Sequence, residues 1–208
     1  MSKVKIKTSR QKIANILLSI GCVNINFKNK FILTSGKKSP VYVDCRKLVS
    51  FPKEREIIIN EMSKQIKDIY KGEIIVAGGE TAGIPYSSFI SQKLKLPMVY
   101  IRKQPKCFGK GKLIEGEFRK KSKSILIEDM ATDGGSKIHF INSMRKAHLS
   151  VKDIFVVFFY DIYPSAKENM KKMRVNLNYL ASTLTRYRQR SSTLLLQASS
   201  SSSSSWRF

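Results

Sequence analysis

The pattern of hydrophobic and polar positions switches repeatedly between two periods along the first 160 residues. Apolar residues recur every three or four positions in four segments, which predicts helices over 8–19, 54–69, 85–95 and 136–147. Short, nearly unbroken apolar runs lie between them and predict buried strands over 74–77, 98–101, 125–127 and 154–160. Strands that alternate with helices indicate an α/β, doubly wound, mostly parallel sheet flanked by helices. Ligands of such a sheet bind beyond the carboxyl ends of its strands.

A different pattern occupies the segment between the first two predicted helices. Residues 31–33 and 41–44 are short apolar and aromatic runs, and they flank the turn Thr34-Ser-Gly-Lys-Lys-Ser39. This arrangement predicts a β-hairpin whose turn presents several hydrogen-bond donors.

The most informative chemistry follows the predicted strand at 125–127, which leads directly into Glu128 and Asp129. The next segment, 132–136, contains two glycines, whose freedom at positive φ lets consecutive backbone N–H groups turn toward one anion. The hydroxyl groups of Thr132 and Ser136 add donors, and the predicted helix directs the positive end of its dipole to the same point. A phosphate monoester fits such a loop.

The two carboxylates must have another use, because they repel a phosphate. At the end of a strand they suit sugar hydroxyls, or a magnesium ion that bridges to a second phosphate. Residues 125–137 therefore predict a ligand with a phosphate, a diol and a metal-bound diphosphate. The alternative is a strand that ends in solvated acids before a glycine turn.

Two further loops are predicted at the same edge of the sheet. Gly78-Gly-Glu-Thr-Ala-Gly83 follows one strand and precedes a helix, so its backbone N–H groups suit a diphosphate; a tight turn without a ligand is the alternative. Its glycine spacing differs from the dinucleotide-binding fingerprint. Residues 102–111 form a basic, glycine-containing loop typical of a lid, although such a charge run also suits a solvated surface.

Together these motifs resemble a known family. Segment 125–137 is similar to the phosphoribosyl diphosphate motif of type I phosphoribosyltransferases. With the hairpin turn, the Gly-Glu-Thr-Ala-Gly-Ile-Pro turn and the Arg-Lys-x-Pro-Lys loop, it resembles the orotate phosphoribosyltransferases over about residues 10–180. The resemblance implies the type I fold with a small N-terminal hood. It also implies transfer of a phosphoribosyl group from 5-phosphoribosyl 1-diphosphate (PRPP) to orotate, which gives orotidine 5′-phosphate and diphosphate in pyrimidine synthesis.

The resemblance assigns roles to individual residues. Glu128 and Asp129 hold the 2′ and 3′ hydroxyls of the ribose, and the loop 132–136 holds its 5′-phosphate. Arg102, Lys103 and Lys106 hold the diphosphate. The backbone around Tyr42 and Val43 lines the base pocket, and Thr132 also contacts orotate. The catalytic residues implied are Lys106, Asp129 and Glu128. The substrate-binding residues implied are Arg102, Lys103, Lys106, Glu128, Asp129, Met130, Ala131, Thr132, Asp133, Gly134, Gly135, Ser136, Tyr42 and Val43.

Cofactor and partners follow from the same resemblance. It implies Mg²⁺ held mainly through the diphosphate of the substrate, with no certain protein ligand. It further implies a homodimer in which the lid of one subunit reaches the site of its partner.

Four positions depart from the pattern common in the family. Where Thr34, Ala82, Phe108 and Ile162 stand, many relatives carry a lysine, another basic residue, a histidine and an arginine. The arginine commonly recognises the carboxylate of orotate, for which Lys37, Lys38 or a backbone N–H of the glycine turn are the substitutes here. Two other functions are therefore kept as alternatives: a phosphoribosyltransferase for another base, such as a purine, and a non-catalytic regulator that binds PRPP. The intact lid cations argue against the regulator.

Composition narrows the remaining possibilities. The net charge of +24 favours polyanionic ligands, but the lysines are spread along the chain without an arginine-rich block, so we do not expect nucleic acid as a partner. The three cysteines lie far apart, which fits a reducing cytoplasm, and with only two histidines a zinc site is not expected. No apolar run approaches the ~20 residues that span a bilayer.

The C-terminal segment differs from the rest of the chain. We expect a phosphoribosyltransferase domain over 1–180 and an atypical Ser-rich tail over 181–208, because poly-serine buries too little apolar surface to order itself. The alternative origin of this segment is a shift of the reading frame near codon 181.

Overall fold

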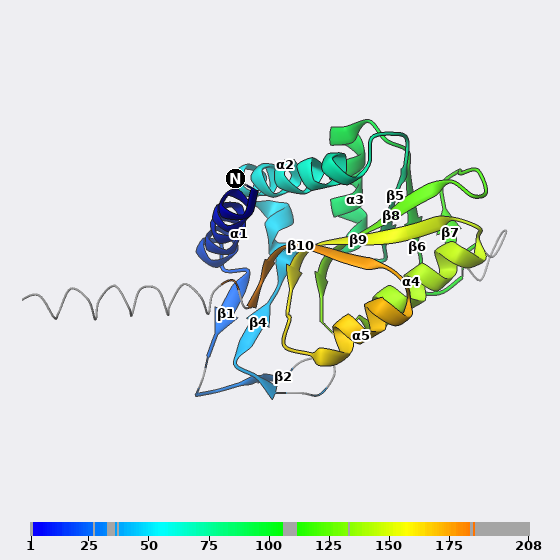
Figure 1. The fold of residues 1–208 in the computed structure, drawn as a ribbon. Helices are drawn as coiled ribbons and strands as arrows, with labels where there is room; N and C mark the ends of the chain where they lie inside the picture. The colour runs from blue at the N-terminus through cyan, green and yellow to red at the C-terminus, as the bar shows by residue number, and fades with distance from the viewer. Residues whose placement is uncertain are drawn as a thin grey trace, which may run out of the picture.

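A six-stranded sheet forms the centre of the molecule (Figure 1). The computed structural model describes residues 2–26, 28–32, 36, 38–105, 112–132, 134–183 and 185. The strands of the sheet are, in spatial order, β10 (Asn176–Ser182), β9 (Ser150–Phe159), β8 (Lys123–Ala131), β5 (Ile75–Gly79), β6 (Met98–Ile101) and β7 (Ile114–Glu115). All neighbouring strands run parallel except β6 and β7, which are antiparallel. The predicted fold class, a mostly parallel α/β sheet, is confirmed.

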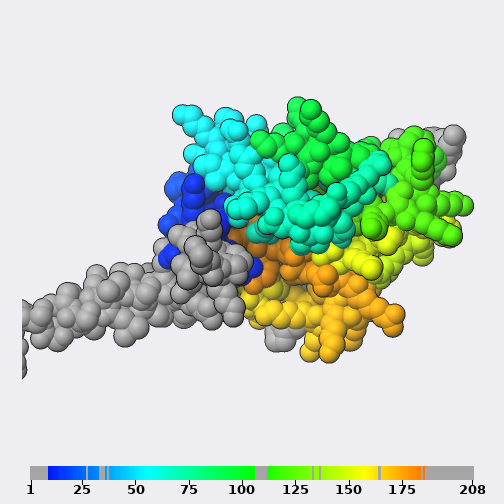
Figure 2. Space-filling model, turned by 45° about the horizontal axis from the view of Figure 1, so that its top comes forward, coloured from blue at the N-terminus to red at the C-terminus, as the bar shows by residue number. Residues whose placement is uncertain are grey.

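Helices cover both faces of this sheet. On one face lie α2 (Pro52–Ile69) and α3 (Gly83–Leu94), and α1 (Ser2–Ser19) packs beside them and against β10. Figure 2 looks onto this face, where α2 appears in cyan and α3 in green. On the other face lie α4 (Gly135–Lys146) and α5 (Pro164–Lys172). The alternation of side chains along β8 explains the two layers, since Ile125 and Ile127 pack in the first core and Leu126 in the second.

The segment between α1 and α2 forms a small hood of two-stranded pairs. β2 (Phe31–Ile32) pairs with β3 (Lys38–Ser39), and β4 (Val41–Val43) pairs with β1 (Val23–Ile25). A 3₁₀ helix, η1 (Cys45–Ser50), connects β4 to α2. The prediction that 31–33 pairs with 41–44 was wrong. Residues 31–32 pair with 38–39 instead, and Pro40 separates β3 from β4. β4 is held by the Tyr160 hydroxyl, which accepts a hydrogen bond from the Val43 N–H at 2.9 Å.

Several element boundaries differ from the prediction. β8 begins two residues earlier than expected and ends at Ala131, four residues later, while β5 includes the first two glycines of the 78–83 loop. β10 continues to Ser182, and residues 186–208 lie outside the described part of the chain. No helix in the described ranges is both long enough and apolar enough to cross a membrane.

Candidate active site

Three of the predicted site segments meet at one edge of the sheet. β5 lies between β8 and β6, and all three run parallel, so their carboxyl ends point the same way. The segments that follow them are 80–82, 102–105 and 132–134. Sheet topology therefore brings the glycine turn, the base of the basic loop and the phosphate-type loop together.

The acid pair lies inside β8 and is buried. Glu128 is 4% exposed and Asp129 is 7% exposed, and the strand continues for two residues beyond them. The alternative of solvated acids at a strand end is therefore wrong, because both side chains are buried in the packed structure. Two unsolvated carboxylates require a compensating charge or a hydrogen-bonded ligand.

A lysine of α4 supplies part of that compensation. Lys137, itself 7% exposed, places its Nζ 2.9 Å from Oε2 of Glu128. The other oxygen, Oε1, is buried without a hydrogen-bond partner among the described residues. Sequence reasoning did not select Lys137. The available signal was a charged residue in the first turn of a helix that packs on the sheet beside two acids.

Burial raises the pKa values of both acids. For Glu128, desolvation raises the pKa from 4.5 to about 7, although Lys137 and the nearby Gly79 N–H lower it. The pKa of Asp129 is also raised by desolvation, against the lowering effects of Lys137, the Met130 N–H and Arg46. The Met130 N–H donates to Oδ1 of Asp129 at 2.8 Å. Glu128 therefore changes its charge state near neutral pH, in response to its neighbours.

The Glu128 carboxylate fits beside β5 and α3 because two residues there are glycines without a Cβ. A Cβ at Gly79 or Gly83 would collide with Oε1 of Glu128, and at Gly83 it would also lie 2.6 Å from the carbonyl oxygen of Ile127. The glycine turn thus has a packing role in addition to any ligand contact of its N–H groups.

We expect Gly83→Ala to displace Glu128, with a cost of ~1–3 kcal/mol in the free energy of unfolding because the added methyl group meets backbone. The matched control is Gly72→Ala, where a Cβ meets nothing within 4 Å. Thermal unfolding of both variants and their Michaelis constants for the substrate test this; equal behaviour would contradict the packing role.

The predicted phosphate loop opens α4 as expected. Gly134 has φ 87° and its carbonyl accepts from the Ile138 N–H at 3.1 Å, so glycine is required where the chain enters the helix. A Cβ there would lie 2.6 Å from Cε of Met170 on α5. Thr132 is half-buried beside this turn, whereas Asp133 and the side chain of Ser136 lie outside the described part.

The base of the basic loop is tied to both neighbouring strands. The Arg102 N–H donates to the Leu113 carbonyl at 2.8 Å, and the Arg102 side chain lies 3.9 Å from Glu115 on β7. The Lys103 N–H donates to Oε2 of Glu80 at 2.7 Å. Glu80 is a second residue that sequence reasoning missed, and it fixes the loop to the end of β5. Residues 106–111, including Lys106, lie outside the described part.

The hood contributes a cation near the acid pair. Arg46 on η1 forms an ion pair with Asp44 at 2.7 Å and is close enough to Asp129 to lower the pKa of that acid. Tyr42 is half-buried against Phe31, with ring centroids 5.6 Å apart, and the Val43 N–H is engaged by Tyr160. Arg46 was not selected from the sequence either.

Known proteins place this geometry in a family. No family model matches the chain. The orotate phosphoribosyltransferase of Ruegeria sp. is 40% identical over 171 residues, which cover 81% of this chain and 76% of that protein. The chain belongs to the orotate phosphoribosyltransferase family. The family predicted from the sequence motifs is thereby confirmed, and with it the enzyme class, a glycosyltransferase that transfers a pentosyl group.

Two solved structures have a similar fold. The enzyme of Aeropyrum pernix superposes with a TM-score of 0.72 at 25% identity, covering 86% of this chain and 98% of that one. The UMP synthase of Leishmania donovani gives a TM-score of 0.74 at 29% identity, covering 90% of this chain and 39% of that one.

Two of the four positions that depart from the common orotate phosphoribosyltransferase pattern are described. Ile162 is 45% exposed and follows Asp161, whose carboxylate pairs with Lys167 at 2.6 Å. Ala82 is half-buried immediately before α3. Thr34 and Phe108 lie outside the described part.

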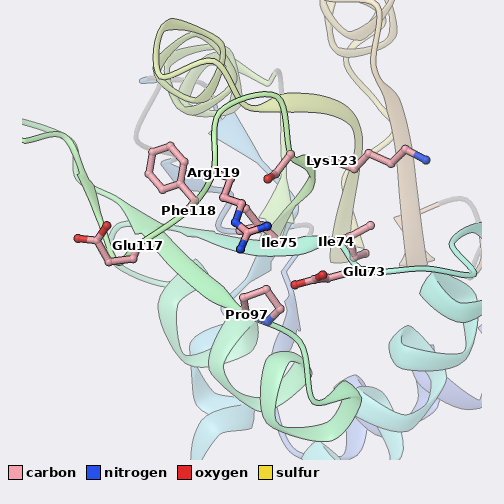
Figure 3. A pocket seen from close by; sticks show the side chains of 9 residues that line it. Glu73, Ile74, Ile75, Pro97, Glu117, Phe118, Arg119 and Lys123 are labelled. Carbon is pink, nitrogen blue, oxygen red and sulfur yellow. The ribbon is translucent and has the colours of Figure 1, made fainter.

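A hollow of about 600 Å³ lies at the opposite edge of the sheet (Figure 3). Its lining includes Ile75 and Lys123, the first residues of β5 and β8, and Pro97 just before β6. The charged lining residues Glu73, Glu117, Arg119 and Lys123 carry both signs. This hollow faces away from the acid pair and does not form part of the candidate active site.

Proposed function

We propose that the carboxyl edge of this sheet transfers the phosphoribosyl group of PRPP to orotate, giving orotidine 5′-phosphate and diphosphate. The observation that carries the proposal is the 40% identity to an orotate phosphoribosyltransferase across four fifths of the chain. The buried acid pair beside a glycine-capped helix supplies the matching chemistry, a diol site next to an anion site.

Each segment of the edge has a part in this proposal. Glu128 and Asp129 accept hydrogen bonds from the ribose hydroxyls, and the loop 132–136 holds the 5′-phosphate at the start of α4. Arg102, Lys103 and Lys106 hold the diphosphate. The hood around Tyr42 and Val43 faces the base, with Thr132 beside it.

The reaction is a displacement at the anomeric carbon. The bond from that carbon to diphosphate breaks while a ring nitrogen of orotate bonds to it, and positive charge develops on the ribose. Lid cations stabilise the departing diphosphate, and the buried carboxylates lie beside the charge that develops on the sugar. Closure of the 102–111 loop excludes water, which otherwise hydrolyses the sugar. The orotate nitrogen is acidic enough to need little help from a base.

Magnesium fits this site as an ion that arrives with the donor. Oxygen ligands suit Mg²⁺, yet one of the two carboxylates is already paired with Lys137, and no cluster of three or more His, Cys, Asp or Glu side chains occurs among the described residues. The diphosphate therefore supplies most of its ligands. When bound, the ion neutralises charge on the leaving group.

The remaining assignments extend the same proposal. The phosphoribosyltransferase domain, expected over residues 1–180, extends to the end of β10 at Ser182, and the Ser-rich segment that follows is an atypical tail. The enzyme acts in the cytoplasm as a homodimer in which the 102–111 loop reaches the partner's site.

Activity with PRPP should depend on pH through Glu128. Its raised pKa, about 7, leaves the carboxyl protonated and a poorer acceptor below neutrality. We expect kcat/KM for PRPP to fall by ~tenfold per pH unit below about 7 and to level off above it. The phosphate groups of PRPP also change protonation in this pH range. The control is therefore Glu128→Gln, whose pH profile contains the titration of PRPP but not that of Glu128. Superimposable profiles would contradict the role of Glu128.

The base specificity is tested by a panel of acceptors. Product formation from PRPP is measured with orotate, uracil, hypoxanthine and adenine at equal concentration. The proposal predicts product with orotate alone. A preference for a purine would contradict it and favour the alternative, a phosphoribosyltransferase for another base.

A further inference from the structure

The Lys137–Glu128 pair occupies an unusual position for an ion pair. Both side chains are more than nine-tenths buried, and their charged atoms are 2.9 Å apart next to a second buried acid, Asp129. Taking two charges out of water costs several kcal/mol per ion before their attraction offsets it. An apolar side chain at position 137 would avoid this desolvation cost. The charge of Lys137 therefore has a functional role.

The direction of the two carboxylate oxygens indicates that use. Oε2 of Glu128 is bonded to Lys137, whereas Oε1 has no partner among the described residues and lies against Gly79 and Gly83. These glycines belong to the turn next to which the donor binds in the proposed function. Oε1 is thus the oxygen of Glu128 left to accept a hydrogen bond.

Charge balance gives a second, independent reason. The proposed donor carries a phosphate and a diphosphate, and two adjacent buried carboxylates repel both. Lys137 is bonded to Glu128 and acts electrostatically on Asp129, while Arg46 acts on Asp129 from the hood. With Lys137 present, the acids accept hydroxyl groups at about half of their combined negative charge.

We propose that Lys137 is a positioning residue for donor recognition, which holds Glu128 as an oriented carboxylate and offsets its charge against the phosphates of PRPP. The inference rests on the proposed function, because it takes the ribose diol as the ligand of the acid pair.

Loss of Lys137 weakens donor binding by either of two routes. If Glu128 then takes up a proton, it loses its strength as an acceptor for hydroxyls. If Glu128 stays charged, it repels the donor phosphates without compensation. The charged groups that face Glu128 are Lys137 and Asp129, and those that act on Asp129 are Lys137 and Arg46. None of the others replaces the contact at Oε2.

The test compares Lys137→Met, Lys137→Arg and the control Lys146→Met, which removes an exposed lysine from the last turn of the same helix. We expect Lys137→Met to raise KM for PRPP and its calorimetric Kd by ~tenfold or more, with KM for orotate within twofold. Lys137→Arg should stay within threefold of the wild type, and Lys146→Met should match it.

Other outcomes overturn the inference. Unchanged or tighter PRPP binding by Lys137→Met would do so, and so would equal increases in both Michaelis constants, since these indicate a general structural loss. If Lys137→Met does not fold, Lys137→Gln takes its place. Equal PRPP binding by the Gln and Arg variants would then overturn the inference. A wild-type protein inactive with orotate contradicts the proposed function instead, and calorimetry with PRPP then still decides the role of Lys137.

Discussion

Replacing Lys106 by alanine is expected to lower kcat by ~100- to 1000-fold while the protein stays folded. In the proposed mechanism this lysine meets the diphosphate as it departs, and removal of one preorganised donor to developing charge typically has an effect of this size. The position lies on the 102–111 loop, whose base is fixed by the Lys103 N–H to Glu80 and by Arg102 to Leu113. Thermal unfolding should therefore change little.

The control for this variant is Lys120→Ala, which removes an exposed lysine from the turn before β8. Steady-state kinetics at saturating PRPP and orotate give kcat for both proteins. A Lys106→Ala variant that keeps kcat within threefold of the wild type would remove Lys106 from the catalytic residues.

The second large effect is expected from the double variant Glu128→Gln, Asp129→Asn. Hydrogen bonds to charged groups contribute about 1.5–3 kcal/mol each, so loss of both carboxylates should lower kcat/KM for PRPP by ~100-fold or more. The side chains keep their size, so the packing around Gly79, Gly83 and Phe140 is preserved.

A variant that keeps Lys137 but lacks the charge of Glu128 removes the carboxylate 2.9 Å from a buried ammonium, which is destabilising. The triple variant with Lys137→Met therefore controls for stability. If its unfolding temperature recovers but its kcat/KM for PRPP stays well below that of Lys137→Met alone, the acids act on the donor. Recovery of both would show that the acids only support the fold.

Much of the fold was predictable because the central elements are strongly patterned. The apolar runs at 98–101 and 154–160 correspond to β6 and β9, and the helical stripe at 54–69 corresponds to α2. The elements missed are short, marginal or polar. β7 has two residues, β10 lies at the edge of the sheet and begins with alternating polar and apolar residues, and among the α5 side chains that the structure describes only Ala166 and Met170 are buried. Such segments are ordered by tertiary contacts that a local pattern does not contain.

The candidate site was predictable to a similar depth. Residues adjacent in a motif, such as Glu128, Asp129 and Gly134, could be selected because their chemistry is contained in one segment. Lys137, Glu80 and Arg46 were missed because their roles depend on contacts between elements. Lys137 on α4 pairs with Glu128 on β8, and Glu80 accepts a hydrogen bond from Lys103, 23 positions away. Burial of the acids was missed for the same reason, since only the packed structure covers them.

The most direct test of the account is release of diphosphate from PRPP by the purified protein with and without orotate, in the presence of Mg²⁺. The account predicts diphosphate release that requires orotate and is matched, mole for mole, by orotidine 5′-phosphate. Release at the same rate without orotate, or no release with it, would contradict the assignment of this site to orotate phosphoribosyl transfer.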